Sequence, residues 1–389
     1  MNNMLTTLIN IYKKSFTMQY IKAILFLVSF TMALIFISCE NATTPPTPTK
    51  SVRDYTWTID TLNIPDAFQN LMSSMYAANS EDIYLVGHNS GSQIYAGDGK
   101  MWHYNGKDWS VVRLRDQLGG FQLKAIHGSS SNNVWAVGSR QSSGDDFPTS
   151  FIAQYNGVSW KEHLRKSPNG IYDEPLSKSD VYSVYVESET EVWACGEGGV
   201  VYHYDGTSWD VDTIRIELNE DENFIAKDIV IYNSEILLLG FKNFQGAFFG
   251  TYYMFKKENQ DWIIQDSIVQ DAQGIKNWKW GAGYFYLSNS NQLYTMGLGG
   301  VFKLEGHSWT NIFENDSSIE GISEKDENNI LAVGDFGLVF HYNDSDWKKL
   351  SNLEIADKYT CVWQDSDEAI IVGQLLGAYP MKTIVLHGK

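Results

Sequence analysis

Two pairs of neighbouring acidic residues are the first candidates for chemistry in this chain. Asp145 and Asp146 lie in one polar segment, and Asp173 and Glu174 lie in a second. Paired carboxylates can act as acid and base in glycoside hydrolysis, and carboxylate clusters can bind Ca²⁺. The spacing of a calcium-binding loop is absent, and solvated surface charge is the alternative interpretation of both pairs. We therefore assign no catalytic residue from the sequence, and we expect neither a metal ion nor another cofactor.

No local catalytic motif accompanies these carboxylates. The sequence contains no G-x-S-x-G nucleophile turn, no H-E-x-x-H metal pair and no Gly-rich phosphate loop. His103, His203 and His341 share one position in a repeated pattern, in its first, third and sixth copies. These copies are too far apart for the histidines to converge on one metal ion, so we expect them to be structural. We expect a binding or scaffolding module rather than an enzyme. The alternative is a carbohydrate-active protein, either a glycan binder or a glycoside hydrolase or sugar transferase.

Aromatic side chains are concentrated in two segments that carry insertions between predicted strands. Flat aromatic rings can stack on sugar rings or anchor a protein partner. The alternative is that these rings pack beneath the long loops as small satellite cores. The candidate ligand-binding residues are the two acidic pairs above together with Phe244, Phe248, Phe249, Tyr252, Trp278 and Trp280.

A repeat that occurs seven times along the chain must position these candidates. Each copy has a polar turn, an aliphatic segment ending in glycine, a variable loop, and a second segment followed by a turn and a tryptophan, as in residues 133–138 with 151–160. Four short runs of alternating polarity in each copy predict four antiparallel strands, which is the content of a propeller blade. The glycines that close the first half of each copy are Gly87, Gly138, Gly196, Gly240, Gly297, Gly334 and Gly373.

The two ends of the repeat region predict how the ring closes. The last copy lacks its tryptophan, and residues 54–59 form a fourth strand with no blade before it. If Trp57 takes the place of the missing tryptophan, the N-terminal strand completes the C-terminal blade. We therefore expect residues 54–389 to fold as a single all-β domain, a closed seven-bladed β-propeller without a free sheet edge.

The ends of the repeats carry a family resemblance. The G-x-[ST]-W sequence at residues 206–209 and 306–309 is similar to the second half of the Asp-box of sialidase-type repeats. The Asp-box has an acid two residues before the glycine, where this chain has Tyr155, Tyr204 or Leu304. Over residues 54–389 the chain thus resembles bacterial β-propeller proteins of the sialidase-like, kelch-like and WD40-like group. The resemblance implies the fold and no particular activity.

One face of the predicted propeller carries the insertions. Connections from the second to the third strand of a blade, and from one blade to the next, lie on the same face. Because loops that vary on a rigid scaffold are where binding residues concentrate, we expect the ligand or partner on this face, mostly over blades one to five. The long connections are residues 88–100, 139–149, 166–180, 216–226, 241–250 and 267–282.

The first 38 residues are typical of a targeting segment. Three lysines precede an apolar run over residues 23–37, which is followed by Ser38 and Cys39. This is the layout of a bacterial lipoprotein signal, in which Cys39 is lipidated. Residues 39–53 are then the lipidated cysteine and a Thr/Pro-rich tether. We expect a lipid-anchored protein of the bacterial cell envelope, at the outer membrane; an uncleaved membrane anchor is the alternative.

Charge and cysteine content limit the partners. The formal net charge is −18, from 29 basic and 47 acidic residues, which argues against nucleic acid and against contact of the domain with anionic lipid. We expect a protein or glycan partner at the envelope, and membrane contact only through the lipid anchor. Cys195 and Cys361 fall in blades that are not neighbours, so we expect both to be unpaired and buried.

Overall fold

The computed structural model describes residues 50–91, 100–114, 121–140, 149–163, 180–244, 249–270, 278–377 and 379–389. The targeting segment, Cys39 and the tether up to residue 49 lie outside the described residues. Lys50–Lys389 form one compact unit. In the described residues no helix has the length and apolar character needed to cross a membrane.

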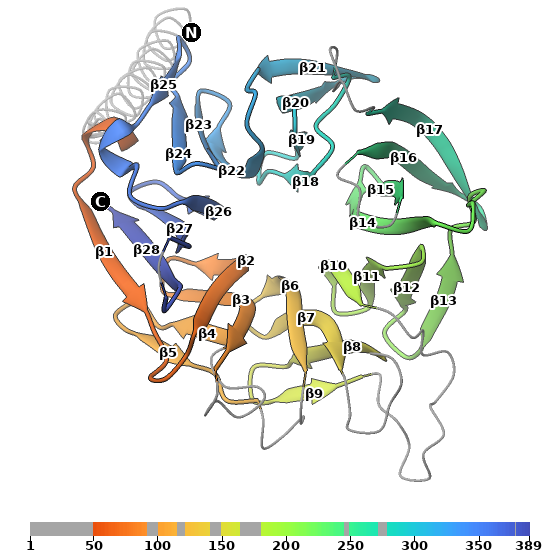
Figure 1. Ribbon diagram of the computed structural model, residues 1–389, viewed down its shortest axis with the longest axis horizontal. Helices are drawn as coiled ribbons and strands as arrows, with labels where there is room; N and C mark the ends of the chain where they lie inside the picture. The colour runs from red at the N-terminus through yellow and green to blue at the C-terminus, as the bar shows by residue number, and fades with distance from the viewer. Residues whose placement is uncertain are drawn as a thin grey trace, which may run out of the picture. The chain divides into compact units, whose positions relative to one another are not determined.

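The compact unit is a closed ring of seven four-stranded antiparallel sheets, so the predicted fold is confirmed (Figure 1). Within each blade the first strand is innermost and the fourth is outermost. The strands are β2 Gln69–Asn79, β3 Asp82–Ser90, β4 Met101–Tyr104 and β5 Trp109–Val111 (blade one); β6 Gln122–Ser130, β7 Asn133–Arg140, β8 Thr149–Tyr155 and β9 Trp160–Glu162 (blade two); β10 Val181–Ser188, β11 Glu191–Gly196, β12 Val200–Tyr204 and β13 Trp209–Thr213 (blade three); β14 Glu222–Tyr232, β15 Glu235–Phe244, β16 Gly250–Glu258 and β17 Asp261–Val269 (blade four); β18 Tyr284–Leu287, β19 Leu293–Gly297, β20 Gly300–Glu305 and β21 Ser308–Phe313 (blade five); β22 Ile319–Asp326, β23 Asn329–Gly334, β24 Leu338–Tyr342 and β25 Trp347–Lys349 (blade six); and β26 Lys358–Gln364, β27 Ala369–Leu375, β28 Lys382–Gly388 and β1 Trp57–Leu62 (blade seven).

The N-terminal strand closes the ring as predicted. Strand β1 pairs antiparallel with β28, from Trp57 opposite Gly388 to Leu62 opposite Thr383. The packed structure begins before Asp54, however, since the short 3₁₀ helix η1 (Val52–Asp54) also belongs to it. Val52 is buried in the core of blades six and seven, and Arg53 donates hydrogen bonds to His341 and Asp346. Two residues assigned to the tether from the sequence are therefore part of the propeller.

A β-bulge explains most of the glycines that close the first half of a copy. In six blades the first strand has an extra residue at the same place, such as Lys124 in β6 and Tyr182 in β10. In four of these six blades the bulge brings the backbone of the first strand against the glycine of the second, at Gly87, Gly138, Gly196 and Gly334. A methyl group on Gly138 would overlap the carbonyl oxygen of Gln122, so only glycine fits there.

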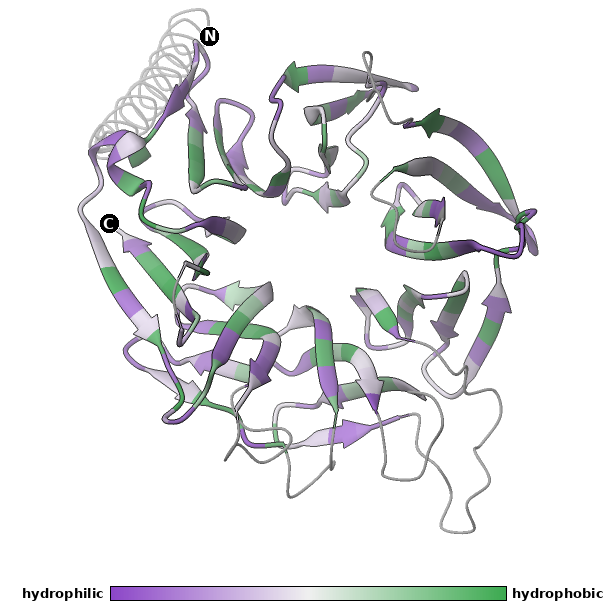
Figure 2. Cartoon of the chain, in the orientation of Figure 1, coloured by the Kyte–Doolittle hydropathy of each residue, from purple (hydrophilic) through white to green (hydrophobic). Residues whose placement is uncertain are grey.

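Apolar side chains fill the spaces between neighbouring blades. Hydrophobic and hydrophilic residues alternate along most strands, as expected for sheets that are packed face to face (Figure 2). The repeat tryptophans pack against the preceding blade: the ring centre of Trp209 lies 5.7 Å from that of Trp135, and the ring centre of Trp347 lies 4.4 Å from that of Phe313. Cys195 and Cys361 are free and buried in these cores.

Polar side chains join every blade to the next, and all of them except Thr383 of β28 lie on inner strands. At most of the junctions a side chain of one blade bonds directly to the backbone of its neighbour. The bonds are Ile126 N to Ser74 Oγ, Val186 N to His127 Nδ1, Ser183 Oγ to Asp228, Phe285 N to Asp228 Oδ2, Glu324 N to the Tyr286 hydroxyl, Gln364 N to Ser323 Oγ, and Met72 N to Thr383 Oγ1. These bonds run once around the ring and fix the inner strands that frame both faces.

Candidate functional site

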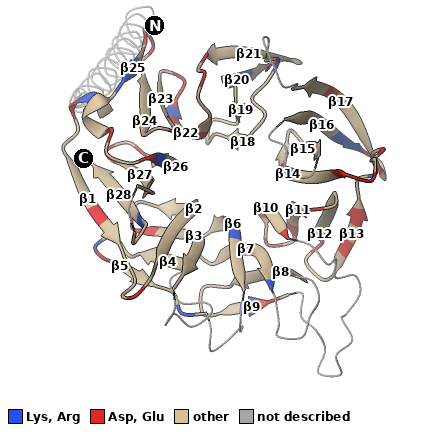
Figure 3. Ribbon diagram, viewed as in Figure 1, with Lys and Arg blue, Asp and Glu red and all other residues tan. Residues whose placement is uncertain are grey.

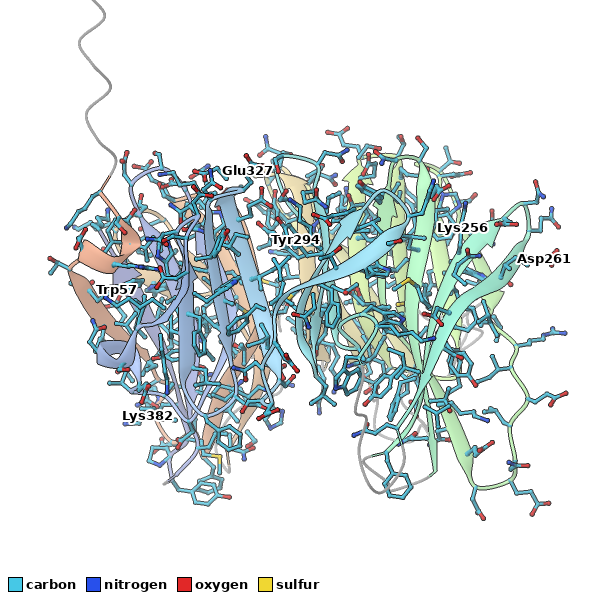
Figure 4. The ribbon with its side chains drawn as sticks, turned by 90° about the horizontal axis from the view of Figure 1, so that it is seen from above. Trp57, Lys256, Asp261, Tyr294, Glu327 and Lys382 are labelled. Atoms are coloured by element: carbon cyan, nitrogen blue, oxygen red, sulfur yellow. The ribbon has the colours of Figure 1, made fainter. Side chains whose placement is uncertain are left out.

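The two faces of the propeller differ in what they expose. We call loop face the side that carries the β3–β4-type and blade-to-blade connections, including Lys382 at the start of β28. The opposite face carries the turns from the first to the second and from the third to the fourth strand of each blade, including Glu327 between β22 and β23. Lys382 and Glu327 lie at opposite edges of the ring in Figure 4. Lys50 bonds to the carbonyl of Lys389 beyond the end of β28, so the chain enters the propeller at the face opposite the loop face.

Several of the predicted candidates lie outside the described residues. These are both acidic pairs, Asp145 with Asp146 and Asp173 with Glu174, together with Phe248 and the lipidation residue Cys39. Phe244 ends strand β15, and its side chain is not described. Their roles in binding stay predictions.

Of the remaining aromatic candidates, only Phe249 is exposed to solvent. Trp280 is 1% exposed and Tyr252 7% exposed, and both lie in the core between blades four and five. Trp278 is partly buried. Its ring lies against Gly299, and its centre is 5.9 Å from the ring centre of Tyr252. This is the packing alternative considered from the sequence. Phe249, which is 40% exposed, is the accessible member of the group.

Tyr252 was expected in a loop and instead lies inside strand β16. The three strands β14, β15 and β16 are longer than the repeat suggests, and Tyr252 pairs with Phe241 in regular register. Because successive side chains of a strand point to opposite faces of its sheet, this register directs the Tyr252 ring into the interblade core.

The repeat histidines have intrablade partners, as predicted. His103 bonds to Asp82, His203 to Glu191 and His341 to Asn329, and in each pair the partner opens the second strand of the same blade. His387 makes the same bond to Glu368 in blade seven. In the part of the chain that the structure describes, no three His, Cys, Asp or Glu side chains come close enough together to hold a metal ion.

Exposed apolar side chains gather on the loop face. Twelve large hydrophobic residues are exposed among those the structure describes, and eight of them lie in connections or strand ends of the loop face. The other four are Ile59, Ile263 and Ile264 on outer strands and Val158 in a turn of the opposite face. The eight are Phe68, Leu218, Phe249, Val269, Tyr284, Phe336, Ile355 and Tyr379.

Four of these eight follow one another over blades six, seven and one, and we call them the apolar rim: Phe336, Ile355, Tyr379 and Phe68. Phe336 is 78% exposed, Tyr379 72%, Phe68 54% and Ile355 41%. The apolar rim was not predicted, because the long insertions indicated blades one to five whereas the apolar rim lies in short connections of blades six, seven and one. The available signal was the turn at residues 335–337, which carries phenylalanine where two other blades carry glycine.

Hydrogen bonds tie the segments that carry the apolar rim to one another. The amides of Leu376 and Gly377 donate to Asp357, at 2.6 and 3.2 Å, which joins the segment after η2 (Ser351–Leu353) to the β27–β28 connection. The amide of Met381 donates to the carbonyl of Phe68 at 2.9 Å, which joins the same connection to the start of blade one. These hydrogen bonds therefore hold the segments that bear Ile355, Tyr379 and Phe68 in place relative to one another.

Ion pairs fix the inner border of this region. Lys358 lies 3.1 Å from both Glu320 and Asp335. Burial opposes the charge of its amine, but the two carboxylates outweigh this and raise the pKa of Lys358. The charge of Lys358 is thus compensated by carboxylates of the protein itself.

A second polar group lies on the inner strands of blades four and five. The amine of Lys227 lies 5.1 Å from the ring centre of Tyr284 and donates to the carbonyl of Ala282 at 3.4 Å. Burial lowers the pKa of Lys227 and raises the pKa of the neighbouring Asp228 to about 6. Since Asp228 already accepts two junction bonds, this group braces the ring.

Comparison with known proteins finds structures that are similar in fold alone. No protein-family model matches the sequence, and no curated protein matches it. Among solved structures, YCF48 bound to D1 peptide has a TM-score of 0.55 at 13% identity and covers 86% of this chain and 97% of its own. The WD40 β-propeller domain of Doa1 has a TM-score of 0.51 at 10% identity, with coverage of 86% and 97%. The β-propeller domain of Cps50 (Swd1) from Myceliophteria thermophila has a TM-score of 0.52 at 10% identity, with coverage of 84% and 99%.

Proposed function

We propose that this propeller is a non-catalytic binding module that recognises a protein partner through its loop face. The observation that carries the proposal is the unequal exposure of apolar side chains, eight of twelve on one face in the described part of the chain. Exposed apolar clusters bordered by polar residues are typical of protein interaction sites. The propeller fold is of a kind that binds proteins, and one similar structure holds a peptide.

We also propose that the propeller is held at the bacterial cell envelope by a lipid on Cys39. The layout of residues 1–39 supports this anchor. The entry of the chain at Lys50, opposite the loop face, supports an arrangement in which the loop face points away from the membrane and remains accessible.

Site-specific photo-crosslinking in the native host tests the protein-binding proposal. A photoreactive phenylalanine analogue is placed at Phe249 or Phe336 on the loop face, and at Val158 as the control. Val158 is the most exposed apolar residue of the opposite face, at 86%. We expect discrete cross-linked proteins from the loop-face positions and none in common with Val158. The same products from both faces would contradict the proposal.

A glycan array of the same protein tests the carbohydrate alternative. Binding that is lost in the Phe249→Ala or Trp278→Ala variants would replace the protein-binding proposal with a glycan-binding one. We expect no glycan to depend on these rings, because Trp278 is engaged with Tyr252 and Gly299. Labelling of the chain with a radioactive fatty acid, and its loss in Cys39→Ser, tests the anchor.

A further inference from the structure

The backbone of Phe336 is strained, and two other blades avoid the strain at the same position. The three turns at 197–199, 298–300 and 335–337 have the same backbone shape. Gly198 has φ +71° and Gly299 has φ +86°, whereas Phe336 has φ +59°. This left-handed region is unfavourable for a residue with a Cβ and costs glycine nothing. An aromatic residue in this place needs a reason other than folding.

Burial does not supply that reason. The side chain of Phe336 is 78% exposed, so its ring gains little from the core of blade six. A large ring held on a strained turn at the surface is what an anchor residue of an interface requires. The neighbouring glycine, Gly337, packs against the carbonyl of Ala356, which brings the turn beside Ile355, the next member of the apolar rim.

The charges around the apolar rim indicate what kind of partner fits it. Lys358 is paired with Glu320 and Asp335, and Lys349 is paired with Glu354, which leaves Lys382 as the remaining basic residue of the bordering segments that the structure describes. The segment before blade six, which accepts a bond from the Asp335 amide at Ser318, adds further exposed acids. The exposed acidic residues of these segments that have no basic side chain as a partner in the described structure are Asp66, Glu314, Asp316 and Asp357.

We propose that the apolar rim binds a segment of a partner protein in which apolar side chains alternate with Lys or Arg. The rings would anchor the apolar side chains, and the bordering carboxylates would attract the basic ones. The acidic border disfavours an anionic lipid surface, and it also disfavours a second copy of this chain, whose rim carries the same charge. This inference rests on the proposed function and narrows it to one surface and one class of partner.

A peptide array tests the inference with the full-length protein. The probes are short peptides of alternating apolar and Lys/Arg residues, the same peptides with Glu in place of Lys/Arg, and peptides with Ser in place of the apolar residues. We expect binding of the first set only, weakened by added salt because the carboxylates are exposed. Equal binding of the acidic set would overturn the inference.

Phe336→Gly is the decisive variant, because it should weaken binding of the partner without lowering the stability of the fold. If Phe336 anchors a partner, Phe336→Gly weakens peptide binding by roughly tenfold or more while its Tm stays equal or rises by a few degrees. Val158→Gly, on the opposite face, is the matched control and should not change binding. Unchanged peptide affinity in Phe336→Gly, or a lowered Tm, would overturn the inference.

Separate measurements distinguish this inference from the proposed function and from other occupants. If the analogue at Phe336 gives no cross-linked protein while the analogue at Phe249 does, the apolar rim is refuted as the site and the proposed function stands. If neither analogue gives one, the two are refuted together. Flotation of the protein without its lipid anchor on anionic vesicles, or concentration-dependent dimerisation abolished by Phe336→Gly, would reassign the apolar rim to a lipid surface or to self-association.

Discussion

At the scale of the residue, burial is the main cause of the shifted pKa values of His341 and Asp228. His341 is 1% exposed and uses both ring nitrogens: Nε2 donates to Asn329, and Nδ1 accepts from Arg53. Burial, aided by the Arg53 charge, lowers the pKa of His341 to about 4. The neutral ring is therefore part of the fold, and a proton at Nδ1 would remove the bond to Arg53.

The first prediction concerns the acid side of the stability profile. A histidine whose pKa is lowered by folding stabilises the protein above its unfolded pKa of about 6.5, and this stability is lost as the pH falls towards 4. His341→Gln does not titrate, so the difference in unfolding free energy between wild type and variant should shrink from pH 7 to pH 4.5, by on the order of 2 kcal/mol. Urea unfolding at the two pH values measures it. A constant difference would show that His341 is protonated in the folded state.

Asp228 should contribute to stability with the opposite dependence on pH. Burial raises the pKa of Asp228 to about 6, so the folded protein holds this proton more tightly than the unfolded chain does. The contribution is present below about pH 4 and is lost as the pH rises to about 6. Asp228→Asn should therefore gain stability relative to wild type over this interval. Parallel urea titrations at pH 4 and pH 6.5 test this, and a relative loss for Asp228→Asn would contradict it.

At the scale of the element, the bulge of the inner strand and the glycine opposite it act as one unit. We predict that Gly138→Ala lowers the unfolding free energy by about 2–3 kcal/mol, because the added methyl group overlaps the Gln122 carbonyl and the backbone must move. Gly321→Ala is the matched control, since its nearest neighbours would lie 3.4 Å away, an ordinary contact. Thermal unfolding of both variants decides the question, and equal Tm values would refute the explanation.

The elements were predictable from the sequence because their signals are local. Alternating polarity, the Asn156-Gly157 turn and the repeat tryptophans each arise within one blade, and together they gave the strand count and the closure by Trp57. The site was not predictable in the same way. Whether Trp280 is covered depends on the packing of blade four against blade five, and the exposure of Phe336 depends on a turn shape shared with Gly198 and Gly299. These relations appear only once the blades are superimposed.

At the scale of the whole molecule, the closing strand β1 holds the ring together. We predict that deleting residues 50–62 greatly lowers stability, because six paired positions of β28 lose their partner and Val52 leaves its core. The exposed edge of β28 should also promote self-association. Trp57→Ala, which leaves the strand pairing intact, is the milder control. Thermal unfolding and light scattering test this, and a deletion variant as stable and monomeric as wild type would refute it.

Charge is distributed over the whole ring as well as around the site. Acidic segments are visible on outer strands such as β1 and β13 (Figure 3). With a net charge of −18, the molecule as a whole attracts basic partners before any contact forms. The apolar rim then supplies the short-range contacts that a general field cannot.

The junction bonds also make the ring observable by hydrogen exchange. At six of the seven junctions, one backbone amide is protected by a side chain of the neighbouring blade: Ile126, Val186, Phe285, Glu324, Gln364 and Met72. Each of these amides can exchange with solvent deuterium only when its own junction separates. Their six exchange rates, read by NMR, would show where around the circle the propeller first opens.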